Sequence, residues 1–272
     1  MNSKNNYRKF GRNKEGPSMV CFLSSIFLLS VFLFSCNSEN APDCFQNAGD
    51  LIRVNADLGE FTSITVYENL NLVIKQGDVY RVEIEIGEFL LNDISATLVG
   101  DRLVLRNENA CNYVRDYGIT TIYVTAPNIS EVRSSTGGLI SSEGILGYPS
   151  LRLISESFAE PEAATTDGAF DLQVAANSIA VLVNGIAFVK LRGQTDNFSV
   201  NVPAGDSRIE AQTLIAQNVT VNHRGSNDIF VHPELRLSGI IRGYGNVISV
   251  NRPAEVEVEE TFNGRLIFRD DL

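Results

Sequence analysis

Cys36 is the residue whose surroundings most clearly predict chemistry. It ends the tetrapeptide Leu33-Phe34-Ser35-Cys36, which follows a basic N-terminus and an uncharged apolar run of 17 residues, Met19–Ser35. A basic region, an apolar region and a small residue next to a cysteine are together typical of a bacterial lipoprotein signal. We therefore expect a peptidase to remove residues 1–35 and a lipid to be attached to the thiol of Cys36.

This signal predicts where the protein resides. The lipid chains on Cys36 would attach the protein to a membrane at about 0.8 kcal/mol for each buried methylene. We expect the bacterial cell envelope, and within it the outer membrane, on a face that the sequence does not specify. An uncleaved signal anchor is the alternative, although spanning a bilayer takes about 20 apolar residues.

Two further cysteines, Cys44 and Cys111, remain once Cys21 leaves with the signal and Cys36 is lipidated. An oxidising envelope predicts a disulfide between them, which would close a long loop and contribute about 4 kcal/mol in the chain-entropy model. Two free thiols are the alternative. The cysteine spacing is not that of a metal site.

The charge of the chain excludes one class of partner. Removing residues 1–35 takes away five basic residues and one acid from totals of 22 and 33, which leaves 17 and 32 and a formal charge of −15. Such a surface repels nucleic acid and anionic lipid. We therefore expect no nucleic-acid partner.

Histidine and carboxylate chemistry were both considered. His223 and His232 are nine residues apart, about half of a repeat described below, so we expect them at opposite ends of a repeat and not in a metal site. Neither histidine lies beside a nucleophile on a strained turn, as a Ser-His-Asp site requires. We expect no catalytic residue, metal or cofactor.

Acidic and amide side chains recur at matching turns: Asp206, Asn227 with Asp228, and Asn246. If the turns stack, these side chains form a ladder. β-Helix enzymes that cleave polysaccharides use carboxylates on such surfaces, some with bound calcium. Asp and Asn also suit turn dihedrals and bond their own backbone, which is the interpretation we favour.

An aromatic cluster gives the candidate binding surface. Tyr113, Arg115, Tyr117 and Tyr123 lie around an irregular loop next to Cys111. Exposed aromatic rings could bind a glycan or a protein at the cell surface. A packed loop shielded by the disulfide is the alternative.

Strand patterns fill the chain after a polar spacer, residues 36–50. Val82, Ile84 and Ile86 alternate with Arg81, Glu83 and Glu85, and Ile122 and Val124 flank Tyr123. This period of two predicts strands with one buried face. We expect residues 51–132 to form an irregular β region and residues 133–272 to form repeats, both within one all-β protein.

Four stretches in the second half share one layout, an apolar strand, a glycine-containing turn and a second apolar strand. They begin at Ile179, Phe198, Val219 and Leu235, and their second strands begin at Val189, Ile209, Ile229 and Val247; a weaker copy runs from Val132 to Ile140. This period predicts a parallel β-helix, or two-sheet β-solenoid, in which each unit buries its apolar face on its neighbours. An antiparallel sandwich is the alternative. Positive φ is expected at the turn glycines Gly185, Gly205, Gly225, Gly243 and Gly245.

Several short motifs resemble a known family. They are Asn109–Arg115, the turns at 204–206, 225–228 and 243–246, and the ending Val250–Pro253 before Gly264-Arg265-Leu266. The chain resembles, from about Leu51 to Phe268, the putative auto-transporter adhesins with a head GIN domain. The resemblance implies a β-helix without catalytic residues and a role in adhesion. The family's Gly-Ser-Gly turn is not preserved; Gly225-Ser226-Asn227 comes nearest.

The sequence thus predicts a non-catalytic, lipid-anchored binding protein of the cell envelope. A β-helix enzyme acting on polysaccharide and a regulatory lipoprotein that binds another membrane protein are the alternatives.

Overall fold

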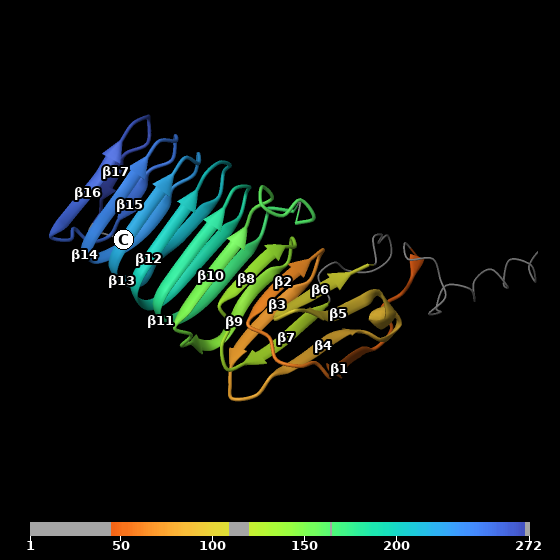
Figure 1. The fold of residues 1–272 in the computed structure, drawn as a ribbon. Coiled ribbons are helices and arrows are strands. Elements are labelled where there is room, and N and C mark those ends of the chain that lie inside the picture. Colours follow the sequence, from red (N-terminus) through yellow and green to blue (C-terminus); the bar gives the residue numbers. More distant parts are fainter. Residues whose placement is uncertain (1–44, 109–119, 164, 270–272) are drawn as a thin grey trace, which may run out of the picture.

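The computed structural model describes residues 45–108, 120–163 and 165–269 (Figure 1). Its strands join in one 17-stranded sheet, so the prediction of an all-β chain is confirmed. No helix in this described part is long and apolar enough to cross a membrane. Cys36, Cys44 and Cys111 lie outside the described residues, as do Tyr113, Arg115 and Tyr117, so the lipidation and the disulfide stay predictions.

Four long strands run side by side and parallel through the C-terminal half (Figure 1): β11 (Ala169–Val183), β12 (Phe188–Val202), β13 (Arg208–His223) and β14 (Ile229–Ile241). Each long strand bends and takes part in two rows of strands. β11, for example, pairs with β9 near its start and with β10 near its end. The antiparallel alternative is therefore wrong for these segments.

The first row aligns the predicted repeat starts. Ile179 pairs with Phe198, Phe198 with Val219, and Val219 with Leu237. The predicted fourth start, Leu235, is wrong. The register shifts between Ala216 and Asn218, where β14 carries one extra residue, so Leu235 is exposed and Leu237 takes the buried position.

The second row confirms the other half of each repeat. Val189 pairs with Ile209, Ile209 with Ile229, and Ile229 with Val247. The weaker predicted copy takes part in both rows. Val132 pairs in parallel with Leu153 of the first row, and Ile140 pairs with Phe170 of the second row. The shorter strands of the two rows are β8 (Glu131–Ser135), β9 (Leu139–Leu146), β10 (Ser150–Ser155), β15 (Val247–Ser249), β16 (Glu255–Glu260) and β17 (Leu266–Phe268).

The N-terminal part makes the sheet mixed. β2 and β3 extend the two rows in parallel with β8 and β9, and each is followed by a further parallel strand, β6 or β7. Antiparallel strands then complete both rows: β5 on β6, and β4 followed by β1 on β7. The elements are β1 (Leu51–Ala56), β2 (Ser63–Tyr67), β3 (Asn71–Gln76), β4 (Arg81–Gly87), the 3₁₀ helix η2 (Glu88–Asp93), β5 (Ile94–Val99), β6 (Arg102–Asn107) and β7 (Thr121–Ala126).

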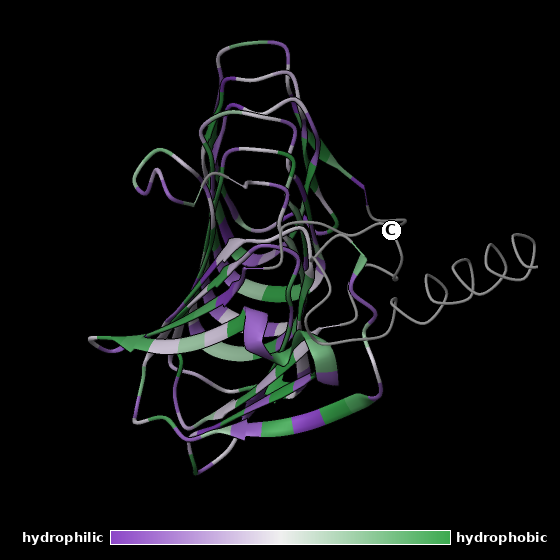
Figure 2. Cartoon of the chain, turned by 90° about the vertical axis from the view of Figure 1, so that its right-hand side faces the viewer, coloured by the Kyte–Doolittle hydropathy of each residue, from purple (hydrophilic) through white to green (hydrophobic). Residues whose placement is uncertain are grey.

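The core lies between the two rows. Phe198, Val200 and Val202 are buried and stack on Val219 and Val221, whereas the alternating residues of these strands face outward. Figure 2 shows a similar change between hydrophobic and hydrophilic residues, as green and purple bands, along the strands that face the viewer at the N-terminal end. The buried side chains form one continuous apolar cluster through the described chain, so each repeat depends on its neighbours for burial.

The five predicted glycines lie at turns, but the predicted positive φ is wrong for four of them. Of the five, Gly205 alone has a positive φ, of 91°. At Gly243, a Cβ atom would lie 2.2 Å from the carbonyl oxygen of Gly225 in the preceding turn. Glycine is therefore needed at Gly243 because successive turns stack backbone on backbone, leaving no room for a side chain.

Candidate ligand-binding groove

Four neighbouring strands, β1, β4, β7 and β3, present an outward face near the N-terminal end of the stack. Tyr123 of β7 pairs with Glu83 of β4 on one side and with Val73 of β3 on the other. The residues on either side of Tyr123 in β7, Ile122 and Val124, and those on either side of Val73 in β3, Leu72 and Ile74, are fully buried. The predicted alternation in these strands is therefore confirmed, and it directs the polar residues outward.

This face contains a groove of about 350 Å³. Its apolar lining combines Tyr123 with the aliphatic side chains of Val73 and Val79, and Val79 is exposed. The polar lining residues are Arg53, Lys75, Arg81, Glu83, Thr125 and Glu143. The groove thus combines apolar and aromatic side chains with charged side chains of both signs.

Two of the three cations in the groove are held by carboxylates. The guanidinium of Arg53 lies 3.9 Å from the centre of the Tyr123 ring and donates a 2.8 Å hydrogen bond to Glu85. The Tyr123 hydroxyl donates to the other carboxylate oxygen of Glu85 at 3.3 Å. Lys75 forms a 2.5 Å ion pair with Glu143, and both of these side chains are largely exposed.

Arg81 differs from the other two cations. No ion pair joins it to a carboxylate within the described residues, and it is exposed in β4 opposite Thr125. A guanidinium presents several donors in a planar arrangement that suits a carboxylate. The groove can therefore hold a ligand by an apolar contact on Tyr123 and Val79 together with an ionic contact on Arg81.

Of the predicted aromatic surface, Tyr123 alone falls within the described residues. It lies on a regular strand and not on a loop. The cations around it were not predicted as site residues, because they come from three separate strands that meet only through the pairing of β1, β4, β7 and β3. One of these cations, Arg81, could have been identified from the sequence, because it occupies an outward-facing position in a strand of alternating apolar and polar residues.

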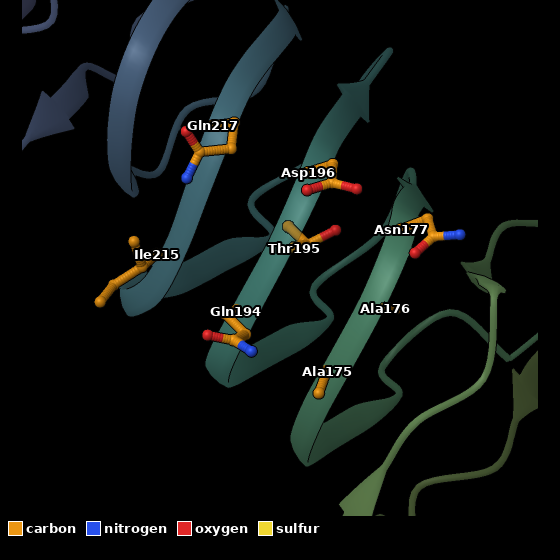
Figure 3. A pocket seen from close by; sticks show the side chains of 8 residues that line it. All are labelled: Ala175, Ala176, Asn177, Gln194, Thr195, Asp196, Ile215 and Gln217. Atoms are coloured by element: carbon orange, nitrogen blue, oxygen red, sulfur yellow. The ribbon is translucent and has the colours of Figure 1, made fainter.

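A second hollow of about 320 Å³ lies where β11, β12 and β13 bend (Figure 3). Its lining is mostly polar: Asn177, Gln194, Thr195, Asp196 and Gln217 accompany Ala175, Ala176 and Ile215. Figure 3 shows these side chains on three adjacent strands along the direction of stacking. It lacks an aromatic ring, so the groove at Tyr123 is the stronger candidate for binding an organic ligand.

The predicted ladder of acidic and amide side chains is present at the turns. Ser226 donates to the carboxylate of Asp206 at 2.7 Å, and Asn246 donates to that of Asp228 through its backbone and side-chain nitrogens at 2.8 and 3.1 Å. These bonds join successive turns to one another. In the described chain, no group of three or more His, Cys, Asp or Glu residues is arranged to hold a metal ion.

The two histidines lie apart, as predicted. His223 pairs with Ile241 near the end of its strand, whereas His232 pairs with Ile215. The His223 ring is completely buried, and its Nδ1 accepts a hydrogen bond from the backbone of Gly225. Burial lowers the pKa of His223 below 6.5, although the Asn227 carbonyl and the Asp228 carboxylate oppose this effect.

This buried imidazole predicts a pH-dependent stability. Below about pH 6.5, the unfolded chain binds a proton at His223 that the folded chain does not bind. The free energy of unfolding is therefore highest above this pH and decreases as the pH falls below it. We expect His223→Gln to flatten the decrease in unfolding free energy between pH 7.5 and 5.5, as measured by urea denaturation. Equal slopes for wild type and H223Q would contradict this assignment.

Arg133 forms the most buried ion pair of the described residues. Its guanidinium donates to Glu156 at 3.0 Å and lies 2.8 Å from Glu160, and the Arg133 and Glu156 side chains are 9% and 4% exposed. The second Glu156 oxygen accepts the amides of Phe158 and Ala159. Burial alone would raise the pKa of Glu156, but these amides and Arg133 lower it overall. This cluster fixes the start of the loop after β10.

Comparison with solved structures supports the fold. A putative adhesin from Bacteroides fragilis matches with a TM-score of 0.72 and 20% identity, over 81% of this chain and 97% of that one. A putative adhesin and a putative lipid binding protein, both from Parabacteroides distasonis, each match with a TM-score of 0.57, at 13% and 15% identity, over 80% of this chain and 98% and 97% of theirs. A search of curated proteins finds no match.

A family model matches residues 60–253, which is most of the chain and lies within the range expected from the motifs. Its description is "Putative auto-transporter adhesin, head GIN domain". The matched segment includes β3, β4 and β7 of the groove and the whole of the long parallel strands. The chain belongs to the family of putative auto-transporter adhesins with a head GIN domain.

Proposed function

We propose that this protein is a non-catalytic adhesin of the cell envelope, anchored by a lipid on Cys36 and built as a β-solenoid. The parallel, in-register stacking of β11–β14 supports the solenoid, and the family's description supports adhesion. The role of Cys36 rests on the sequence alone. In this arrangement the stack is a scaffold that holds a binding face away from the membrane.

The groove at Tyr123 is the observation that carries the binding role. The guanidinium of Arg81, which forms no ion pair within the described residues, lines the groove together with Tyr123 and Val79, and Glu83 and Thr125 add polar groups. A sugar ring offers an apolar face and several hydroxyls, and a sugar acid adds a carboxylate for the arginine. We therefore propose a glycan that contains sugar acids as the ligand.

The alternative of a polysaccharide-cleaving enzyme has less support. Asp206 and Asp228, its candidate carboxylates, bond side chains of the next turn. The matches reported above are described as adhesins or as a lipid binding protein, and none is described as an enzyme.

Binding of oligogalacturonate to the full chain, purified from membranes in detergent, tests this proposal. Arg81→Ala removes the guanidinium that would bind the carboxylate of the ligand. Tyr123→Ala removes the aromatic ring that would contact the apolar face of the sugar. We expect each change to weaken binding at least ten-fold in isothermal titration calorimetry, because a charge-assisted bond contributes about 1.5–3 kcal/mol.

Arg152→Ala is the matched control, since Arg152 is an exposed arginine on β10, outside the groove. It should bind as tightly as the wild type. The uncharged galactose oligomer should bind at least ten-fold more weakly than the acid. Equal affinity of wild type and R81A for oligogalacturonate would refute the groove as the binding site.

A further inference from the structure

The stack ends in an edge strand, β16, whose outer side is bonded to no strand of the described chain. β16 pairs with β14 alone, in an unbroken register from Arg236–Glu255 to Ile241–Glu260. β16 contains no proline or bulge, so its backbone is regular, and the charges that protect it from pairing with other edges are all glutamates. Figure 1 shows β16 and β17 at the end of the stack opposite to β1.

The backbone of β16 leaves hydrogen-bonding groups directed away from the stack. The amide of Thr261, just after β16, donates to the carbonyl of Ile241 at 2.9 Å. In a parallel sheet, the backbone amide and carbonyl groups of successive residues point alternately to the strand on one side and to the strand on the other. The amides of Glu257 and Glu259 therefore point to β14, and those of Val256 and Val258 point to the open edge.

The apolar row of the core also continues to this edge. Val256 and Val258 occupy the row of Leu237 and Gly239. Leu237 is fully buried, whereas Val256 is 38% exposed because no strand follows it. A further strand that places apolar side chains over Val256 and Val258 would bury them as the earlier repeats are buried.

Charge decides what kind of strand can be added. Glu255, Glu257 and Glu259 form the outward row, and the strand below supplies Arg236, which lies 3.5 Å from Glu255 and also pairs with Glu257. A second copy that paired through its own β16 would place glutamates opposite glutamates, which is destabilising. A partner with Lys or Arg at these positions would repeat the contact that Arg236 makes.

We propose that the β16 edge binds an extended segment of another protein in which apolar residues alternate with Lys or Arg. The segment joins the sheet as an additional strand, with its backbone bonded to Val256 and Val258 and its cations beside Glu257 and Glu259. This site is separate from the groove at Tyr123, and it needs neither the groove nor its ligand.

The test uses a fluorescent Lys-Val-Lys-Val-Lys-Val peptide and the full chain in detergent. The same peptide with alternate backbone nitrogens methylated keeps its charge but cannot complete the ladder. We expect fluorescence anisotropy to show at least ten-fold tighter binding of the unmethylated peptide. Val258→Pro should abolish this difference, because proline removes a donor on the open side while the bonds to β14 remain.

Charge reversal gives a second, independent variant. Glu259→Lys should weaken binding of the peptide at least three-fold, whereas Asp57→Lys, the same change just after β1, should have no effect. If V258P fails to fold, the methylated peptide and E259K decide the question. Equal binding of the two peptides by the wild type would overturn the proposal. So would a dimer in sedimentation velocity that V258P abolishes, because the edge would then be occupied by a second copy.

Discussion

Replacing Phe198 by alanine is expected to lower the free energy of unfolding by about 3–5 kcal/mol, as for other fully buried phenylalanines. Phe198 is 1% exposed and stands between Ile179 and Val219 in the same row. Its ring therefore fills a space bounded by two neighbouring repeats. Those repeats cannot both move inward to close the cavity without breaking their own ladders.

Urea denaturation followed by circular dichroism measures this effect. Ser199→Ala is the matched control, because Ser199 is the next residue of β12 and faces outward. We expect it to change the unfolding free energy by less than about 0.5 kcal/mol. A similarly small effect of F198A would show that this row is not the core of the protein.

Replacing Arg133 by alanine is expected to cost about 3–5 kcal/mol, because Glu156 would stay buried without its cation. Arg152→Ala is the control, since Arg152 is exposed and lies 3.7 Å from Glu131 at the surface. We expect that change to cost at most about 1 kcal/mol. Similar losses in R133A and R152A would contradict a special role for the buried pair.

The pH dependence provides a second measurement of the Arg133 cluster. The pKa of Glu156 is lowered in the folded protein, so its stabilisation is present above the usual carboxyl pKa of 4.5 and is lost as the pH falls through the lowered value. The difference in unfolding free energy between wild type and R133A should therefore shrink as the pH falls below 4.5. A constant difference down to pH 3 would argue against an ionic origin.

The sequence predicted the strands and their alignment well because burial repeats along the chain. Every strand that stacks on a neighbour needs apolar residues at alternate positions, so Phe198 and Val219 could be matched without a structure. Leu235 could not be assigned correctly. The extra residue in β14 shifts its register against β13 by one residue. An apolar residue at this shift, such as Leu235, is therefore easily mistaken for a core residue.

The site was harder to predict because its parts come from distant segments. Tyr123 was identified by residue type, but Arg53 and Arg81 approach it only because β1 and β4 join β7 in antiparallel pairs. Antiparallel strands that are added to a parallel stack produce no repeat in the sequence, so their pairing partners cannot be predicted from a period. Similarly, Gly243 was recognised as a turn residue, while its true constraint is a carbonyl group 18 residues earlier in the chain, at Gly225.

The parallel register also determines how such a molecule can change in length. Neighbouring strands of a sheet are about 4.8 Å apart, and each long strand here meets its neighbours through equivalent side chains. Tandem duplication of one unit, such as residues 188–207, would therefore insert a layer whose two surfaces already fit those around it. Each duplicated unit would lengthen the stack by roughly 5 Å, the spacing between neighbouring strands. The strands at its two ends would remain unchanged.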